Sequence, residues 1–225
     1  MGSFKMFELC LASLMAVSAP AMAANVNVVH GIDGRDFSLA QSLPVDIAVN
    51  GACALKGVTF KQSALVDLPP ADYTVTIHVA DGSCRQAAVI TKKFTIPNDA
   101  SSSFSAVASL DNQGTPQLAI FNNSRELFLP STVTVRHLAK AGPVFVKFSS
   151  RELARSQTSR IRNGKAATLA VLSPRVPYTA TIFTLLSRGP IGRLTGVGAK
   201  KFTIYNVVGS RANGFSVITE RLAPQ

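Results

Sequence analysis

The chain has 225 residues, 47% of them hydrophobic, and its 23 Lys and Arg against 12 Asp and Glu give a net charge of +11. This length admits one large or two small globular domains. A charge of this size creates a field but not a specificity, and the absence of Trp gives no support to a dedicated nucleic-acid site.

The first 23 residues resemble a secretory signal. Lys5 supplies a positive n-region, Leu9 to Val17 an apolar stretch, and Ala21–Ala23 a small-x-small cleavage site. The stretch is shorter than the ~20 apolar residues that cross a bilayer, and no later segment resembles a membrane helix. We therefore expect a mature chain from near Ala24, exported to the periplasm, the cell surface or the medium of a bacterium.

Alternation of apolar and polar residues dominates the rest of the chain and predicts half-buried strands. The pattern is found at Val45–Val49, Tyr73–Val79, Phe104–Leu110 and Gln117–Phe121. Turn clusters such as Asn50-Gly51 and Asp81-Gly82-Ser83 separate these segments. Helical periodicity is missing, and Glu152 to Gln157 could form one turn at most.

Two cysteines, Cys53 and Cys84, remain once Cys10 leaves with the signal. In an exported chain such a pair predicts a disulfide rather than a metal site, because no His or Cys cluster lies nearby. A redox-active pair is the alternative, but the Cys-x-x-Cys spacing is missing.

The chain repeats itself at offsets of 104 to 108 residues. The matching segments are Val26–His30 with Val133–His137, Lys61–Leu65 with Lys165–Leu169, Tyr73–Ile77 with Tyr178–Ile182, and Lys92–Ile96 with Lys200–Ile204. A repeat of this length is a whole domain.

Each copy is about 100 residues with some seven short strands, which is typical of an immunoglobulin-like sandwich. The sequence therefore predicts an all-β protein of two tandem immunoglobulin-like antiparallel β-sandwich domains after a cleaved signal peptide. The predicted domains are residues 24–123 and 131–225, joined by Arg125 to Pro130.

The first copy resembles the DUF4397 family of bacterial exported proteins. The resemblance rests on Val28-Val29-His30, on Leu43–Gly51 and on Leu65–Thr76, covers nearly all of residues 25–123, and is weaker over 131–223. Residues 31–34, Gly-Ile-Asp-Gly, depart from the family's usual Ala-Ser-Pro-Asp. The resemblance implies tandem immunoglobulin-like domains outside the cytoplasm, and the family's function is itself unassigned.

The charge is divided unevenly between the two copies. Residues 24–123 carry six Lys or Arg against eight Asp or Glu, a net of −2, whereas residues 124–225 carry sixteen against three, a net of +13. The densest part, opposed only by Glu152, consists of Lys147, Arg151, Arg155, Arg160, Arg162 and Lys165.

Asn163-Gly164, within this basic segment, is a type I′ hairpin signal. A hairpin there would set Arg162 opposite Lys165 and place Arg160 on the same strand face as Arg162. Like charges directly opposite each other are destabilising, and a bound polyanion would offset this cost.

These observations predict a non-catalytic, exported binding module whose basic second domain engages an anionic envelope or extracellular polymer. The candidate partners are lipopolysaccharide, an acidic polysaccharide, extracellular DNA, or the acidic domain of another copy. A structural component of a surface matrix or filament, built by attraction between acidic and basic domains, is the alternative. A basic surface that only keeps the protein soluble is the plainer interpretation.

An enzyme ranks third among the hypotheses, because the sequence shows no recognisable pattern of catalytic, metal-binding or cofactor-binding residues. His30 and His137 end the first strand of each copy, which favours a shared structural bond to a loop, and His78 falls on a polar, solvated face. Asp33-Gly-Arg-Asp36 is too poor in oxygen ligands for calcium and is interpreted as a turn. The second domain has only three acids, Glu126, Glu152 and Glu220, too few for paired-carboxylate glycosidase chemistry.

Overall fold

The computed structural model describes residues 23–98, 103–123, 132–153, 155–170, 176–185, 189–197 and 202–222. The predicted signal peptide and the predicted joint, Arg125 to Pro130, lie outside these residues, so both stay predictions. Among the described residues, no helix has the length and apolar character needed to cross a bilayer.

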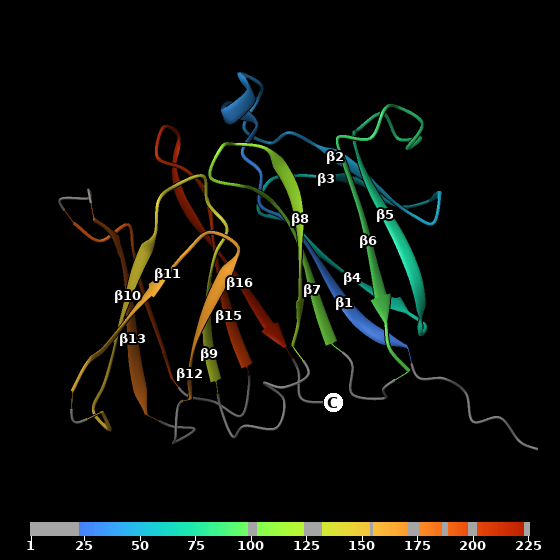
Figure 1. Cartoon of the computed structure of the whole chain (residues 1–225). Coiled ribbons are helices and arrows are strands. Elements are labelled where there is room, and N and C mark those ends of the chain that lie inside the picture. Colours follow the sequence, from blue (N-terminus) through green and yellow to red (C-terminus); the bar gives the residue numbers. More distant parts are fainter. Residues whose placement is uncertain are drawn as a thin grey trace, which may run out of the picture.

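The first half of the chain forms two four-stranded sheets (Figure 1), with strand orders β4-β1-β7-β8 and β3-β2-β5-β6. The strands are β1 (Ala24–His30), β2 (Val45–Val49), β3 (Ala52–Val58), β4 (Ser63–Leu68), β5 (Ala71–Val79), β6 (Ile90–Ile96), β7 (Ser103–Leu110) and β8 (Pro116–Asn122). A single turn of 3-10 helix, η1 (Gly34–Phe37), interrupts the β1–β2 connection.

The second half repeats this topology, with sheets β12-β9-β15-β16 and β11-β10-β13-β14. The strands are β9 (Thr132–His137), β10 (Val144–Ser150), β11 (Gln157–Ile161), β12 (Lys165–Ala170), β13 (Pro177–Thr184), β14 (Gly192–Val197), β15 (Phe202–Ser210) and β16 (Gly214–Leu222). The protein is all-β as predicted. The described residues of each half form eight strands rather than some seven, and one strand pair in each half, β1 with β7 and β9 with β15, is parallel.

One of the matching sequence segments is not structurally equivalent. Lys92–Ile96 lies in β6, an edge strand next to β5. The described part of the matching segment, Phe202–Ile204, begins β15, which is the counterpart of β7 and pairs with β9. This part of the predicted repeat is therefore wrong: both segments have the alternation of a strand, and alternation does not specify a place in a sheet.

Two Asn-Gly pairs that look alike in the sequence form different turns. Asn50 and Gly51, predicted as a turn, have φ angles of 48° and 80°, and their turn closes a hairpin between β2 and its partner β3. At Asn163-Gly164 only the glycine has a positive φ, and the turn joins β11 to β12, which belong to different sheets. The predicted hairpin is wrong, and Arg162 and Lys165 do not face each other across a strand pair.

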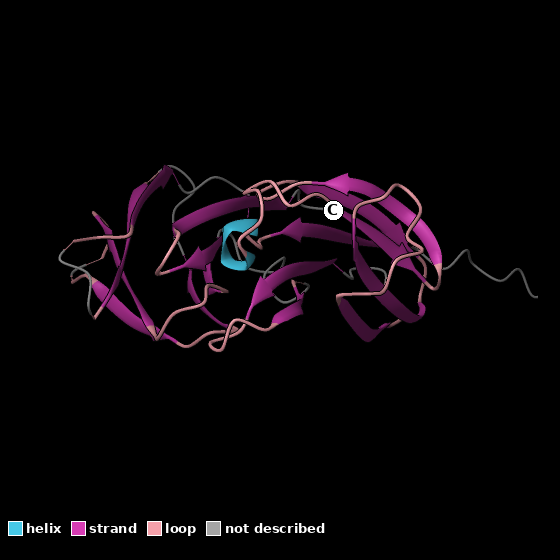
Figure 2. Ribbon diagram, turned by 90° about the horizontal axis from the view of Figure 1, so that it is seen from above, coloured by secondary structure: helices cyan, strands magenta, loops and turns pink. Residues whose placement is uncertain are grey.

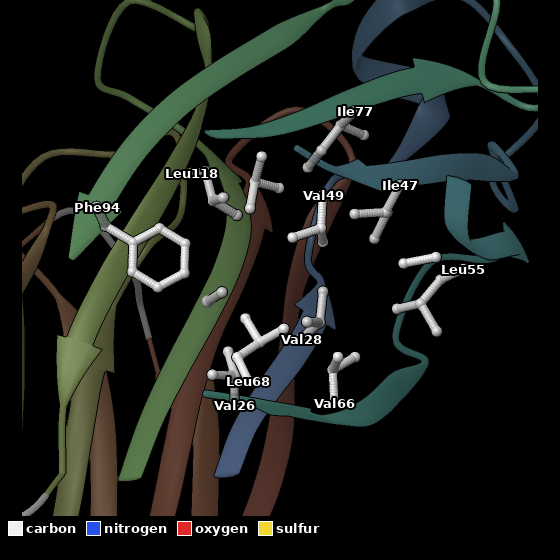
Figure 3. Close-up of a pocket in the computed structure, with 13 residues that line it drawn as sticks. Val26, Val28, Ile47, Val49, Leu55, Val66, Leu68, Ile77, Phe94 and Leu118 are labelled. Atoms are coloured by element: carbon white, nitrogen blue, oxygen red, sulfur yellow. The ribbon is translucent and has the colours of Figure 1, made fainter. Parts of the chain in front are cut away.

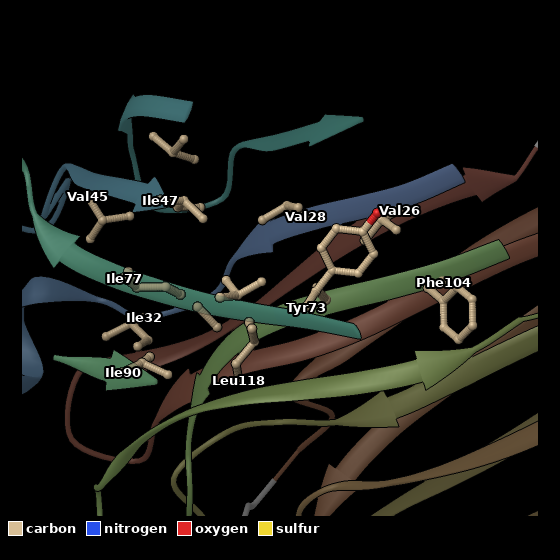
Figure 4. Packing of buried hydrophobic residues seen from close by; sticks show 14 of the residues in the cluster. Val26, Val28, Ile32, Val45, Ile47, Tyr73, Ile77, Ile90, Phe104 and Leu118 are labelled. Atoms are coloured by element: carbon tan, nitrogen blue, oxygen red, sulfur yellow. The ribbon is translucent and has the colours of Figure 1, made fainter. Parts of the chain in front are cut away.

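Each half has its own hydrophobic core between its two sheets. Figure 4 shows part of the first core, in which side chains from both sheets meet. This core contains a void of about 20 Å³. Figure 3 shows the apolar side chains that line it, such as Val28, Ile47 and Leu118. A void of one water's size with an apolar lining is a packing defect rather than a ligand site.

A third apolar cluster joins the halves. It combines Val29 and Val107 from the first half with Leu138, Val208 and Ile218 from the second. The sheet containing β1 and β7 therefore packs against the sheet containing β9 and β15, and seen from above the molecule is elongated (Figure 2). Every residue of β7 is buried, which corrects the expectation of a half-buried strand at Phe104–Leu110.

Polar side chains are buried beside this third cluster. Glu220 accepts hydrogen bonds from Asn27 at 2.6 Å and Ser105 at 2.7 Å, both in the first half. Arg136 forms an ion pair with Glu220 at 3.4 Å and lies 4.1 Å from the centre of the Phe121 ring. The hydrogen bonds to Asn27 and Ser105 and the contact with Phe121 therefore link this buried ion pair of the second half to the first half.

Candidate functional site

The six basic residues singled out in the sequence occupy three places. Lys147 and Arg160 lie on neighbouring strands, β10 and β11. Arg151 and Arg155 lie in the connection at one end of these strands. Arg162 and Lys165 lie beyond the opposite end, where the chain crosses to the other sheet. All six are exposed, and the structure places them in these three places rather than in one group.

Lys147 and Arg160 share the outer face of the β11-β10-β13-β14 sheet, called here the cationic face. The core side of this sheet is formed by alternate residues such as Val146, Phe148 and Ile182. Strand pairing then assigns the intervening residues to the outer side. They are Thr158 and Arg160 from β11, Phe145, Lys147 and Ser149 from β10, Thr179, Thr181 and Phe183 from β13, and Arg193 and Thr195 from β14.

Two rows of this face hold its cations. Lys147 aligns with Thr181 on β13, and Thr181 aligns with Arg193 on β14. Because strands lie ~4.8 Å apart, Lys147 and Arg193 are separated by about 10 Å. In the next row Arg160 aligns with Phe145. The four strands contain no Asp or Glu, so no carboxylate on this sheet competes for these cations.

Two aromatic rings lie beside the cations. Phe145 and Phe183 stack with their ring centres 5.6 Å apart and their planes 14° apart, and both are half-buried. Phe183 and Arg193 are not among the residues predicted from the sequence, because they lie far along the chain from the basic segment. Within β13 and β14, alternation places both residues on the outer side of the sheet. Together with the alignment of these strands beside β10, this signal would have found them. Phe148, by contrast, is a core residue.

The chemistry of these side chains is suited to contacts with anionic groups. Lys and Arg supply charge-assisted hydrogen bonds to sulfate, carboxylate or phosphate groups. The hydroxyls of Ser149, Thr158, Thr179, Thr181 and Thr195 add weaker donors and acceptors. Stacked rings provide an apolar surface, on which the carbon face of a sugar or a base rests.

His30 and His137 have the same structural role in the two halves, as predicted. The His30 Nε2 lies 2.8 Å from the carbonyl of Leu43, and its Nδ1 accepts a hydrogen bond from the Ile32 backbone N–H. His137 bonds in the same way to Gly142 and Ala139. Burial lowers the pKa of both imidazoles and outweighs the opposite effect of the carbonyl contacts.

His78 is buried, not solvated as predicted. Its ring nitrogens lie 2.7 Å from the carbonyl of Gln86 and 2.8 Å from the hydroxyl of Thr76. The β5–β6 loop, residues 80–89, folds back over His78, since the Gln86 carbonyl belongs to this loop. The period-two pattern correctly placed His78 on the outer side of the strand, but such a pattern contains no information about a loop that covers this side.

The same loop is fixed by Asp46 and by the disulfide. The Asp46 carboxylate accepts backbone N–H bonds from Gly57 at 2.8 Å, Asp81 at 3.0 Å and Gly82 at 2.7 Å. Burial alone would raise the pKa of Asp46, but these N–H groups lower it below its usual value. The predicted bridge between Cys53 and Cys84 is present and links β3 to the loop.

The acidic residues considered for calcium binding or for catalysis lie apart from one another. Asp33 caps η1 and pairs with Arg35 at 2.7 Å, which agrees with the predicted turn. Glu152 is exposed after β10, Glu220 is buried between the halves, and Glu126 lies outside the described residues. Within the part of the chain that the structure describes, no group of three or more His, Cys, Asp or Glu could hold a metal ion.

Comparison with known proteins identifies one family. A family model described as "Domain of unknown function (DUF4397)" matches residues 24–147, which run from β1 into β10. No curated protein matches the chain.

Among solved structures, a carbohydrate-binding module of family CBM26 from Eubacterium rectale Amy13K, in complex with maltoheptaose, is 12% identical. The match covers 89% of this chain and 98% of the module, with a TM-score of 0.27. At that score no property of the module is carried over to this chain.

Proposed function

The chain belongs to the DUF4397 family, which assigns no activity, and from this premise we propose that it is an exported, non-catalytic protein that binds an anionic polymer through its cationic face. The observation that carries the proposal is the grouping of Lys147, Arg160 and Arg193 around a stacked Phe pair, on four strands without an acid.

The charge of the second half supports attraction to polyanions in general. Arg136 and Glu220 are buried and neutralise each other. The net charge of +13 of residues 124–225 is therefore carried by the other side chains. Attraction of this kind accelerates association and is weakened by salt.

The cationic face adds a fixed geometry to this general attraction. Its strands are hydrogen-bonded on a packed core, so the three cations project from a rigid surface rather than from a loop. An acidic polysaccharide would place charged groups on Lys147, Arg160 and Arg193 and rest a sugar ring on Phe145 and Phe183. Export is proposed because disulfides such as Cys53–Cys84 persist in oxidising compartments.

Affinity chromatography on heparin, a sulfated polysaccharide, tests the face. We compare R160Q/R193Q, which removes two cations from it, with R162Q/K165Q, which removes two cations outside it. Both variants lose the same charge. The proposal requires R160Q/R193Q to elute at a clearly lower salt concentration, with a shallower dependence of affinity on salt, by about one unit per lost contact.

Equal losses in the two variants would mean that charge alone, and not the face, causes retention. Light scattering at low and high salt tests the alternative of a structural assembly. Salt-sensitive polymers at low salt would favour a matrix or filament component over the binding protein proposed here.

A further inference from the structure

An apolar cavity of about 210 Å³ opens at one end of the first sandwich. Its inner wall includes Ile32, Val45, Ile77 and Ile90, which Figure 4 shows gathered at one end of the core. These side chains come from the β1–β2 loop, β2, β5 and β6. The cavity is therefore an extension of the core that side chains do not fill.

The cavity offers an occupant no free hydrogen-bonding side chain. His30 is the one polar residue among the described residues that line it. Both of its ring nitrogens are engaged by the loop backbone, at Leu43 and Ile32. Burying a polar group there would leave that group unsatisfied, so the part of a ligand that enters must be hydrocarbon.

The rim of the cavity is unusually apolar for an exposed surface. Phe37, Leu39, Val79 and Val89 line it and are 39%, 51%, 41% and 53% exposed. They are four of the six large exposed hydrophobic residues in the described part of the chain. Single exposed apolar side chains are ordinary, whereas a group around a cavity marks a binding site.

The site belongs to the first half alone. The β1–β2 connection there spans residues 31–44, whereas its counterpart between β9 and β10 spans only 138–143. The additional residues include η1, Phe37 and Leu39, which build one side of the rim. Val89, on the other side, ends the loop that the disulfide fastens.

The long connection is fixed by the second half of the chain. The Arg35 guanidinium donates to the carbonyl of Asn213 at 2.8 Å, and the Asn213 amide donates to the Asp36 carboxylate at 2.7 Å. The rim is thus held open by contacts between the halves. A preformed cavity reduces the ordering cost of binding.

We propose that this cavity binds the alkyl chain of an amphiphile, with the polar head group left in solvent beyond the rim. The cavity is larger than the roughly 150 Å³ apolar cavity that accommodates benzene. A linear chain matches both parts of the site, because its end fills the cavity while the next methylenes cross Phe37 and Leu39. This inference does not depend on the cationic face.

Titration with hexyl, heptyl, octyl and nonyl glucoside below their micelle concentrations tests the proposal, using protein labelled at the isoleucine δ1 methyls. The methyl signals of Ile77 and Ile90 should shift and saturate, while those of Ile182 and Ile204 in the second sandwich stay unchanged. Affinity should rise roughly fourfold per added methylene until the cavity is full.

Charged substitutions at the rim complete the test. L39D and V89D should each weaken octyl glucoside binding at least tenfold, whereas L65D, at an exposed apolar residue of the same sandwich outside the cavity, should not. The circular dichroism spectrum and melting temperature of each variant verify its fold. Absent saturation, shifts in both sandwiches, affinity independent of chain length, or equal effects of L65D and V89D would overturn the proposal.

Discussion

Individual buried polar residues hold the loops of this protein against its sheets. His30 and His137 each bond one carbonyl and one backbone N–H of the loop that follows their strand. Since Nδ1 accepts from an N–H group, it carries no proton, and Nε2 donates to the carbonyl. The bonding pattern therefore requires a neutral imidazole in both halves.

Stability should consequently fall in mild acid. The pKa of each imidazole is lower in the folded protein than the ordinary value of 6.5, so the unfolded state binds more protons as the pH drops below that value. As the pH falls, each histidine then lowers the free energy of unfolding by up to about 1.4 kcal/mol per pH unit, until the pH reaches the pKa of that histidine in the folded protein. Melting temperatures measured at pH 7.5 and pH 5.0 should show this loss of stability. In H30Q the melting temperature should fall less between these two pH values. An unchanged melting temperature would contradict this role.

The Asp46 carboxylate also holds a loop against a sheet, and it does so as a charged acceptor of backbone hydrogen bonds. We expect D46N to destabilise the fold by roughly 3 kcal/mol, because an amide group would face backbone donors where the carboxylate now accepts. Urea denaturation measures the difference. D67N, at an acid on β4 for which the structure gives no comparable set of bonds, is the control and should change stability little. A similar midpoint for both variants would show that the loop bonds contribute nothing.

At the scale of elements, loops rather than strands distinguish the two halves. The same eight-strand topology occurs twice, but among the residues that the structure describes only the first half has η1 and a disulfide-linked loop, residues 80–89. That loop covers His78 and carries Val89 to the rim of the cavity. A repeated scaffold with different loops allows the halves to differ in function.

Removing the disulfide should loosen this loop first. Cys53 and Cys84 are separated by 31 residues, for which the chain-entropy model gives a stabilisation of about 3–4 kcal/mol. The variant C53S/C84S should unfold at correspondingly lower urea, and backbone amides of residues 80–89 should exchange faster. Exchange that is unchanged in the loop would show that Asp46 alone suffices to hold it.

At the scale of the whole molecule, the interface between the two halves has one apolar region and one region that contains a buried ion pair. Val29, Val107 and Val208 pack in an apolar cluster there, whereas Glu220 accepts hydrogen bonds from the first half and pairs with Arg136 of the second. Because Arg136 is buried with it, each charge depends on the other for compensation. The two sandwiches are therefore expected to unfold together.

The variant E220Q should lose roughly 3–5 kcal/mol, since it leaves the Arg136 charge buried without its counter-ion. Differential scanning calorimetry should show one transition for the native protein and two for E220Q, once the junction no longer couples the halves. E152Q, which removes the same charge from an exposed side chain, should change stability by no more than about 0.5 kcal/mol. Two transitions in the native protein would contradict the coupling.

The sequence by itself determined the features that depend on local pattern. Period-two alternation located strands such as Val45–Val49, and the Asn50-Gly51 pair located a turn. The matching positions of His30 and His137 indicated a shared structural role. The pairing of Cys53 with Cys84 followed because no other partner remained. These inferences succeed because backbone geometry and side-chain chemistry act over a few residues.

The tertiary structure alone decided which surfaces are covered and which strands are neighbours. Alternation assigns residues to two sides of a strand, but the second side of β7 is buried only because another sheet packs on it. Asn163-Gly164 crosses between sheets for the same reason: its local sequence permits a turn, and the packing of the whole chain selects the partner strands. The cationic face, the cavity and the Glu220 network are likewise built from residues distant in sequence, so no local pattern specifies them.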